Sequence, residues 1–192
     1  LGQWSPPKAF DLRKEAWELK AESLHSHLRG LAGPRVSLLP HQLYIAHEVS
    51  KRDRPRALLA DEVGLGKTIE AGLIFSSLRA LGRANRVLIL VPESLTHQWL
   101  AELYRRFNTL FSVASDESEE FSSEQLWIVP LPLILSNTDK LNDLLNESWD
   151  LVIVDEAHHL KWNPEKADPA WKILKEVSLK CDGLLLLTAT PR

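Results

Sequence analysis

Short apolar runs alternate along the chain with longer segments that carry apolar residues at helical spacing. The apolar runs have the length of strands and lie at residues 57–60, 86–92, 126–129, 151–154 and 184–187. The segments of helical periodicity lie at residues 69–81, 96–107, 139–145 and 170–179. Continuous apolar runs are typical of strands buried on both faces. Their alternation with helices predicts an α/β fold with a mainly parallel sheet and helices on both faces.

The N-terminal part differs from the rest of the chain. Residues 10–29 alternate charged with apolar residues in the pattern of an amphipathic helix. The glycines and proline of residues 30–34 end that pattern, and a second helix is expected to begin near Pro40. We therefore divide the chain into a lead-in with an amphipathic helix, residues 1–35, and one α/β domain, residues 36–192.

The composition is that of a soluble globular domain, since 44% of the 192 residues are hydrophobic and 26% are charged. The net charge of −3 excludes a generally basic, nucleic-acid-coating surface. No apolar run approaches the roughly 20 residues of a membrane span, so no membrane partner is expected. Cys181 is the single cysteine, which fits a reducing compartment. The chain has no Met, opens on Leu1 and stops at Arg192 after a strand-like run, and we interpret it as part of a longer protein.

The candidate chemistry begins at residues 60–68, Ala-Asp-Glu-Val-Gly-Leu-Gly-Lys-Thr. This segment joins a predicted strand to a predicted helix, which gathers backbone N–H groups and a helix N-terminus around one anion. Such a turn can hold a triphosphate, with the Lys67 ammonium on the outer phosphates and the Thr68 hydroxyl on Mg²⁺. The general phosphate-loop pattern has a glycine five positions before Gly66, where this chain has Asp61. On these residues alone, an ordinary loop with a chance Gly-Lys-Thr stays open as the alternative.

A second acidic element follows another predicted strand. The apolar residues 151–154 lead directly into Asp155, Glu156, Ala157 and His158. Ligands of open α/β sheets bind outside the carboxyl ends of the strands, where both this tetrad and the glycine loop are expected. Asp155 is then placed to hold Mg²⁺, and Glu156 to orient or deprotonate the attacking water. Two adjacent acidic residues are common on any surface, but their position after a buried strand favours the nucleotide site.

At this point three segments resemble motifs of a known family. Residues 61–68, 155–158 and 188–191 are similar to motifs I, II and III of the Swi/Snf branch of superfamily-2 helicase-like ATPases. The phosphate loop of that branch reads Asp-Glu-x-Gly-x-Gly-Lys-Thr, which accounts for Asp61. The resemblance implies a RecA-like fold of the P-loop NTPase class, with ATP and Mg²⁺ as cofactors. The nucleotide-binding positions that it implies are Gln42, Asp61, Glu62, Gly64, Leu65, Gly66, Lys67 and Thr68.

The resemblance also assigns roles to single residues. It makes Lys67 and Glu156 catalytic, and Thr68 and Asp155 the magnesium ligands. Gln42 aligns with an adenine-reading glutamine, and an amide matches the donor and acceptor of the adenine edge. A lone glutamine is otherwise a surface residue. The residues implied to couple motif II to motif III, and so to the nucleic-acid site, are His158, Thr188 and Thr190.

Pro92, Glu93 and Ser94 match a family motif whose loop contacts a nucleic-acid backbone. A strand-to-helix turn with Ser94 as helix N-cap is the competing interpretation, and both can hold together. The acidic, serine-rich residues 115–124 are expected to form a solvated loop. Five tryptophans fall on predicted elements and are expected in the core or an interface: Trp17, Trp99, Trp127, Trp149 and Trp171.

Family members move along duplex nucleic acid by closing and opening two RecA-like lobes. The resemblance therefore implies an ATP-dependent translocase or remodeller of which this chain is the first lobe. The similarity is greatest to bacterial members that act on RNA polymerase and favour its recycling. It implies nucleic acid (duplex DNA above all) and RNA polymerase as partners, in the bacterial cytoplasm near the nucleoid. The second lobe supplies an arginine finger and is absent here, so the chain alone is expected to hydrolyse ATP barely.

Three alternatives stay open. A DEAH-type RNA helicase shares motif II, but the loop of residues 61–68 argues against it. A Swi/Snf-like helicase of a phage-defence or restriction system would share all three motifs. A non-catalytic binding module with this fold is disfavoured because Lys67 and Glu156 are both present.

Overall fold

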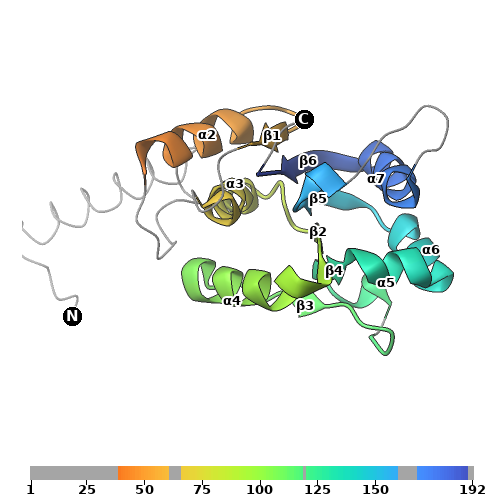
Figure 1. The fold of residues 1–192 in the computed structure, drawn as a ribbon. Helices are drawn as coiled ribbons and strands as arrows, with labels where there is room; N and C mark the ends of the chain where they lie inside the picture. Colours follow the sequence, from red (N-terminus) through yellow and green to blue (C-terminus); the bar gives the residue numbers. More distant parts are fainter. Residues whose placement is uncertain (1–38, 61–65, 119, 160–167, 190–192) are drawn as a thin grey trace, which may run out of the picture.

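A single parallel sheet organises the protein. The computed structural model describes residues 39–60, 66–118, 120–159 and 168–189. In these ranges a six-stranded sheet has the order β1-β6-β5-β2-β4-β3, and every pair of neighbours is parallel (Figure 1). The strands are β1 (Arg56–Leu59), β2 (Val87–Val91), β3 (Ser112–Val113), β4 (Leu126–Pro130), β5 (Trp149–Val154) and β6 (Cys181–Leu187).

Helices cover both faces of this sheet (Figure 1). One face packs against α2 (Pro40–Ser50), α3 (Lys67–Ala80) and α4 (Thr96–Phe107). The other packs against α5 (Leu131–Ser136), α6 (Thr138–Asn146) and α7 (Pro169–Lys180). Since side chains alternate along a strand, Ile89 joins the first core and Leu88 and Leu90 join the second. The predicted α/β fold is confirmed, and no described helix has the length and apolar character needed to cross a bilayer.

The element boundaries differ from the predictions in a few places. All five predicted strands are present, but β6 begins at Cys181 rather than at residue 184. The two-residue strand β3 and the short helix α5 were not predicted, because neither is long enough to show a period. The predicted helix at residues 10–29 lies outside the described residues.

The acidic segment of residues 115–124 is not only a solvated loop, as the sequence predicted. Phe121 in its short 3₁₀ turn η3 (Phe121–Ser123) is 0% exposed. Its ring lies 5.2 Å from that of Trp127 in an edge-to-face arrangement. Its backbone N–H donates to the Asp143 carboxylate at 2.8 Å. The abundance of acidic residues hid this single apolar anchor.

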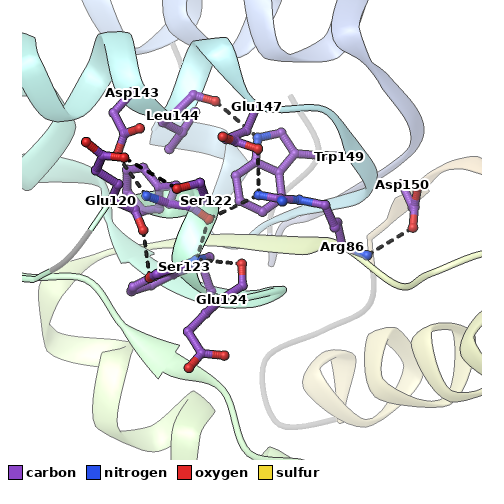
Figure 2. Close-up of polar contacts among 12 residues, drawn as sticks. Arg86, Glu120, Ser122, Ser123, Glu124, Asp143, Leu144, Glu147, Trp149 and Asp150 are labelled. Carbon is purple, nitrogen blue, oxygen red and sulfur yellow. Dashed lines mark hydrogen bonds and ion pairs between the residues drawn. The ribbon is translucent and has the colours of Figure 1, made fainter.

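A polar network closes the edge of the sheet at which the strands begin (Figure 2). The Arg86 guanidinium lies 2.7 Å from the Glu147 carboxylate and donates to the Phe121 carbonyl at 3.0 Å. It also lies over the Trp149 ring, 5.2 Å from its centroid. The Asp150 carboxylate accepts from the backbone N–H of Arg86 at 2.9 Å. The Arg86 side chain thus connects the start of β2 with the start of β5 and with η3.

Candidate functional site

The opposite edge, where the strands end, holds the residues singled out in the sequence. The last paired residues lie in register: Leu59 pairs with Leu187, Leu186 with Val154, and Val154 with Leu90. The segments that follow β1, β6, β5 and β2 therefore leave the sheet side by side. Because the carboxyl ends of parallel strands form the ligand edge of such sheets, this edge is the candidate functional site.

The N-terminus of α3 forms the first part of the site. Gly66 is the N-cap, with a left-handed φ of +85°, and Lys67 and Thr68 are the first two helical residues. The Gly66 carbonyl accepts from the backbone N–H groups of Ile69 and Glu70 at 2.8 and 3.0 Å. Because the N-cap is a glycine, it has no side chain to cap the first backbone N–H groups of α3, and such groups at a helix N-terminus can bind an anion. The predicted positions Asp61, Glu62, Gly64 and Leu65 lie outside the described residues.

Gln42 lies against this turn. Its side chain is 3% exposed, although glutamine is a polar residue. A Cβ atom placed on Gly66 would stand 3.1 Å from the Gln42 amide nitrogen. Helix α2, which carries Gln42, also approaches α3 through His41, whose Nε2 lies 3.7 Å from a Glu70 carboxylate oxygen. The structure thus brings Gln42 next to the glycine that begins α3.

Asp155 and Glu156 follow β5 directly. The backbone N–H of Asp155 donates to the Leu90 carbonyl at 2.9 Å, which continues the pairing with β2. One carboxylate oxygen of Asp155 accepts from the Glu156 N–H at 2.8 Å, and the other accepts from the Trp99 indole N–H at 2.8 Å. Glu156 has a positive φ of 52°, which is uncommon for a residue with a side chain and often marks a functional position.

Glu156 leads through His158 to the end of β6. The His158 Nδ1 atom lies 3.0 Å from a Glu156 carboxylate oxygen and 3.5 Å from the Thr188 hydroxyl. Thr188 is 3% exposed, and its backbone N–H donates to the Leu59 carbonyl at 3.0 Å. The ends of β1, β5 and β6 are therefore joined by polar contacts. Thr190 lies outside the described residues.

The segment after β2 approaches the site only in part. Pro92 lines a cavity of about 200 Å³ that Asp155 and Glu156 also line. Glu93 and Ser94 are exposed in a short 3₁₀ turn, η2 (Glu93–Leu95), and Glu93 lines a different depression beside β3 and α5. The N-cap of α4 is Leu95, so the prediction that Ser94 caps this helix is wrong. The 3₁₀ turn places Ser94 ahead of the capping position.

The contact between Trp99 and Asp155 was not predicted from the sequence. The sequence predicted a core or interface residue, and Trp99 is 1% exposed, but its indole N–H also donates to Asp155. Helical periodicity reports which face is buried and not where one donor atom points. Among the described residues, no group of three or more His, Cys, Asp or Glu side chains is gathered in a way that could hold a metal. A magnesium ion with a nucleotide needs fewer protein ligands, since one or two carboxylates and the phosphates suffice.

Comparison with known proteins adds a family and a fold. Residues 35–192 match the protein-family model described as "Type III restriction enzyme, res subunit". Over 99% of its length the chain is 47% identical to the RNA polymerase-associated protein RapA of Yersinia pseudotuberculosis and 48% identical to that of Pectobacterium carotovorum. The chain spans 21% of the length of these relatives.

Two solved structures of an archaeal protein have a similar fold. The SWI2/SNF2 ATPase core of Sulfolobus solfataricus in complex with dsDNA superposes with a TM-score of 0.71 at 24% identity. That match covers 83% of this chain and 33% of that chain. The core domain of the same ATPase gives a TM-score of 0.68 at 22% identity, covering 83% of this chain and 32% of that chain. These likenesses concern the fold, which is that of a RecA-like ATPase core.

Proposed function

We propose, from the premise that this chain belongs to the family described as "Type III restriction enzyme, res subunit", that residues 36–192 are the ATP-binding lobe of a nucleic acid translocase. The observation that carries the proposal is the meeting of two elements at one sheet edge. The helix N-terminus at Lys67 follows β1, and the pair Asp155 and Glu156 follows β5. In this fold class, a triphosphate bound at the helix N-terminus lies close enough to the acidic pair for the two carboxylates to take part in its hydrolysis.

ATP binds in this proposal at the N-terminus of α3. The backbone N–H groups of the first turn and the Lys67 ammonium hold the phosphates. The loop positions Asp61, Glu62, Gly64 and Leu65 complete the phosphate loop by family resemblance. Gln42 reads the adenine by family resemblance, because its amide offers both a donor and an acceptor; in the structure its buried side chain lies beside Gly66.

Magnesium is held by the Thr68 hydroxyl and the Asp155 carboxylate. The donor set fits this ion, because hydroxyl and carboxylate oxygens are the ligands that Mg²⁺ prefers. When bound, the ion neutralises charge that develops on the outer phosphates. Glu156 acts as the catalytic base that orients and deprotonates water. His158 and Thr188 then link Glu156 to the end of β6. Together with Thr190, these residues couple the nucleotide site to the nucleic-acid site in this proposal.

The proposed client is RNA polymerase, and the proposed track is duplex DNA. The identity of 47% to RapA over nearly the whole chain supports the first, and the name of that relative states an association with RNA polymerase. Pro92, Glu93 and Ser94 contact the nucleic-acid backbone in this proposal. We place the protein in the bacterial cytoplasm, associated with the nucleoid.

The test measures ATP hydrolysis by the full-length natural protein that carries this chain. Rates are compared for the protein alone, with duplex DNA and with core RNA polymerase, using Glu156→Gln as the inactive control. Hydrolysis that rises with polymerase and disappears in Glu156→Gln supports the proposal. Stimulation by DNA without binding to polymerase assigns the motor to another client. No hydrolysis under any of these conditions overturns the proposal.

A second candidate is a helicase of a restriction system. The name of the matching family favours it, whereas the high identity to RapA favours the first candidate. A DEAH-type RNA helicase is the third; it would share residues 155–158, but the loop of residues 61–68 argues against it. Strand separation on a tailed RNA duplex distinguishes it from a translocase, which moves without separating strands.

The lobe by itself is proposed to bind nucleotide and to hydrolyse it barely. An arginine finger contributes 10³–10⁵-fold to the rate in comparable phosphoryl-transfer sites, and we place this residue in a second RecA-like lobe. Residues 1–192 are therefore expected to turn over ATP at least about 10³-fold more slowly than the full-length protein. Equal rates for the two proteins would refute the need for a second lobe.

A further inference from the structure

We propose that Trp99 is a positioning residue that fixes the Asp155 carboxylate for magnesium. This inference rests on the proposed function, because it assumes that Asp155 is a ligand of the ion. Its basis is the 2.8 Å hydrogen bond from the Trp99 indole N–H to Asp155 Oδ2. Partners of metal-binding side chains commonly set the orientation of the ligand and influence the affinity for the ion.

The two hydrogen bonds of Asp155 fix the plane of its carboxylate. Oδ1 accepts from the Glu156 backbone N–H and Oδ2 accepts from Trp99, each at 2.8 Å. A carboxylate has about four lone-pair sites, so each oxygen keeps acceptor capacity for a cation. Without the indole donor, the adjacent backbone N–H would be the one hydrogen bond from the described residues that restrains rotation about the last side-chain bond. The ligand would then lose orientation before it bound the ion.

The position of the donor is itself fixed by packing. Trp99 is 1% exposed and belongs to the same core as α3 and the sheet. Its ring therefore cannot turn without opening that core. The indole nitrogen donates a hydrogen bond and never accepts one, whereas an ionised carboxylate only accepts. Trp99 is therefore a suitable hydrogen-bond partner for the Asp155 carboxylate. Helix α4 begins directly after η2, which connects this donor to the turn that contains Glu93 and Ser94.

Two other buried tryptophans show that this contact is not a general feature of the core. Trp127 is 3% exposed and donates to the backbone carbonyls of Phe121 and Glu124. Trp149 is 2% exposed and donates to the Leu144 carbonyl at 3.2 Å. Both satisfy their indole N–H on backbone oxygens, whereas Trp99 donates to the side chain of a candidate site residue.

The experiment measures the affinity for ATP as a function of Mg²⁺ concentration, by equilibrium titration of the full-length natural protein. In Trp99→Phe, we expect the Mg²⁺ concentration that gives half of the maximal increase in ATP affinity to rise about 10-fold. This is the low end of the losses in metal affinity caused by removing a hydrogen-bond partner of a ligand. The affinity for ATP in EDTA should stay unchanged, which a merely structural defect would not allow. Trp149→Phe is the matched control, because it also removes a buried indole N–H but lies at the opposite sheet edge.

A second variant removes the hydrogen-bond donor without changing the shape. Replacing Trp99 with 3-benzothienylalanine exchanges the N–H for sulfur and should reproduce the shift even where Trp99→Phe disturbs packing. An unshifted Mg²⁺ dependence in this variant overturns the positioning role. If Lys67→Ala still abolishes ATP binding in that case, the proposed function stands. If the wild-type protein binds ATP equally with Mg²⁺ and in EDTA, and Lys67→Ala has no effect, both proposals fall.

Discussion

The Gln42 amide and Gly66 lie so close that a Cβ atom on the glycine would stand 3.1 Å from Gln42 Nε2. The φ of Gly66 is +85°, a conformation that costs a residue with a side chain roughly 1–2 kcal/mol. We expect Gly66→Ala to lower the free energy of unfolding by about that amount. It should also displace Gln42 and weaken ATP binding, as measured by urea unfolding and by titration with a fluorescent ATP analogue.

Gly82→Ala is the control for this prediction. Gly82 has a comparable φ of +72°, but nothing lies within 4 Å of the position that a Cβ would take. Its substitution should lower stability to a similar extent and leave the affinity for ATP unchanged. Equal ATP affinities for the two variants would show that the contact with Gln42 has no part in nucleotide binding.

Arg86→Lys should lower the free energy of unfolding without changing the affinity for ATP. Lysine keeps the charge but loses the planar fork that reaches Glu147 and Phe121 together. The side chains of Arg86 and Glu147 are only 27% and 21% exposed, so the loss exceeds that of a surface pair, at about 1–3 kcal/mol. Chemical denaturation measures it, and hydrogen exchange should report faster opening around η3. Arg105→Lys, at an exposed position on α4, should change neither quantity.

The positive φ of Glu156 predicts that a glycine variant is more stable than an alanine variant at this position, the reverse of the usual order. Glycine normally destabilises relative to alanine, but at a φ of 52° it avoids a penalty of about 1 kcal/mol or more. Glu156→Gly should therefore be more stable than Glu156→Ala, although both lose the carboxylate. At Glu124, with an extended φ of −132°, the alanine variant should be the more stable one. The same order at both positions would contradict a strained backbone at Glu156.

Burial raises the pKa of the Cys181 thiol, and the nearby Arg56 offsets this only in part. The folded protein therefore holds the thiol proton at pH values where the unfolded chain has released it. This contribution to stability is complete below the pKa of the unfolded thiol and is lost as the pH rises toward the folded pKa. Cys181→Ala should flatten the alkaline decline of the free energy of unfolding. Alkylation by iodoacetamide should follow unfolding, and rapid alkylation of the native protein would contradict the prediction.

The fold followed from the sequence where apolar runs were long. Runs such as residues 87–91 are buried along their whole length, and a sequence of that kind has few other stable solutions. The order of strands across the sheet did not follow, because it depends on pairings such as Leu59 with Leu187, and apolar runs of similar composition do not identify their neighbours. Residues 112–113 and 131–136 gave too short a signal to be recognised as elements.

The candidate site was predictable where a residue type restricts the chemistry. Lys67, Asp155 and Glu156 follow strands and carry charges, so their place at one edge could be inferred. The contact that holds Asp155 could not. The donation from Trp99 to Asp155 depends on side-chain directions across separate elements, whereas the family resemblance already paired His158 with Thr188, which lie 3.5 Å apart. Periodicity and motif spacing contain no information on such directions.

The position of β6 between β1 and β5 determines when the site can form during synthesis. β1 emerges early from the ribosome, yet β6 is its neighbour among the described strands and is made last of them. A nascent chain that ends before Cys181 has already produced Lys67 and Asp155, but among the described strands β1 still has no hydrogen-bonded neighbour. Pairing over such a long stretch of chain is slow, and the exposed strand edges meanwhile invite association with other chains. Among the described strands, the sheet edge that carries the candidate site is therefore completed only when β6 has been made.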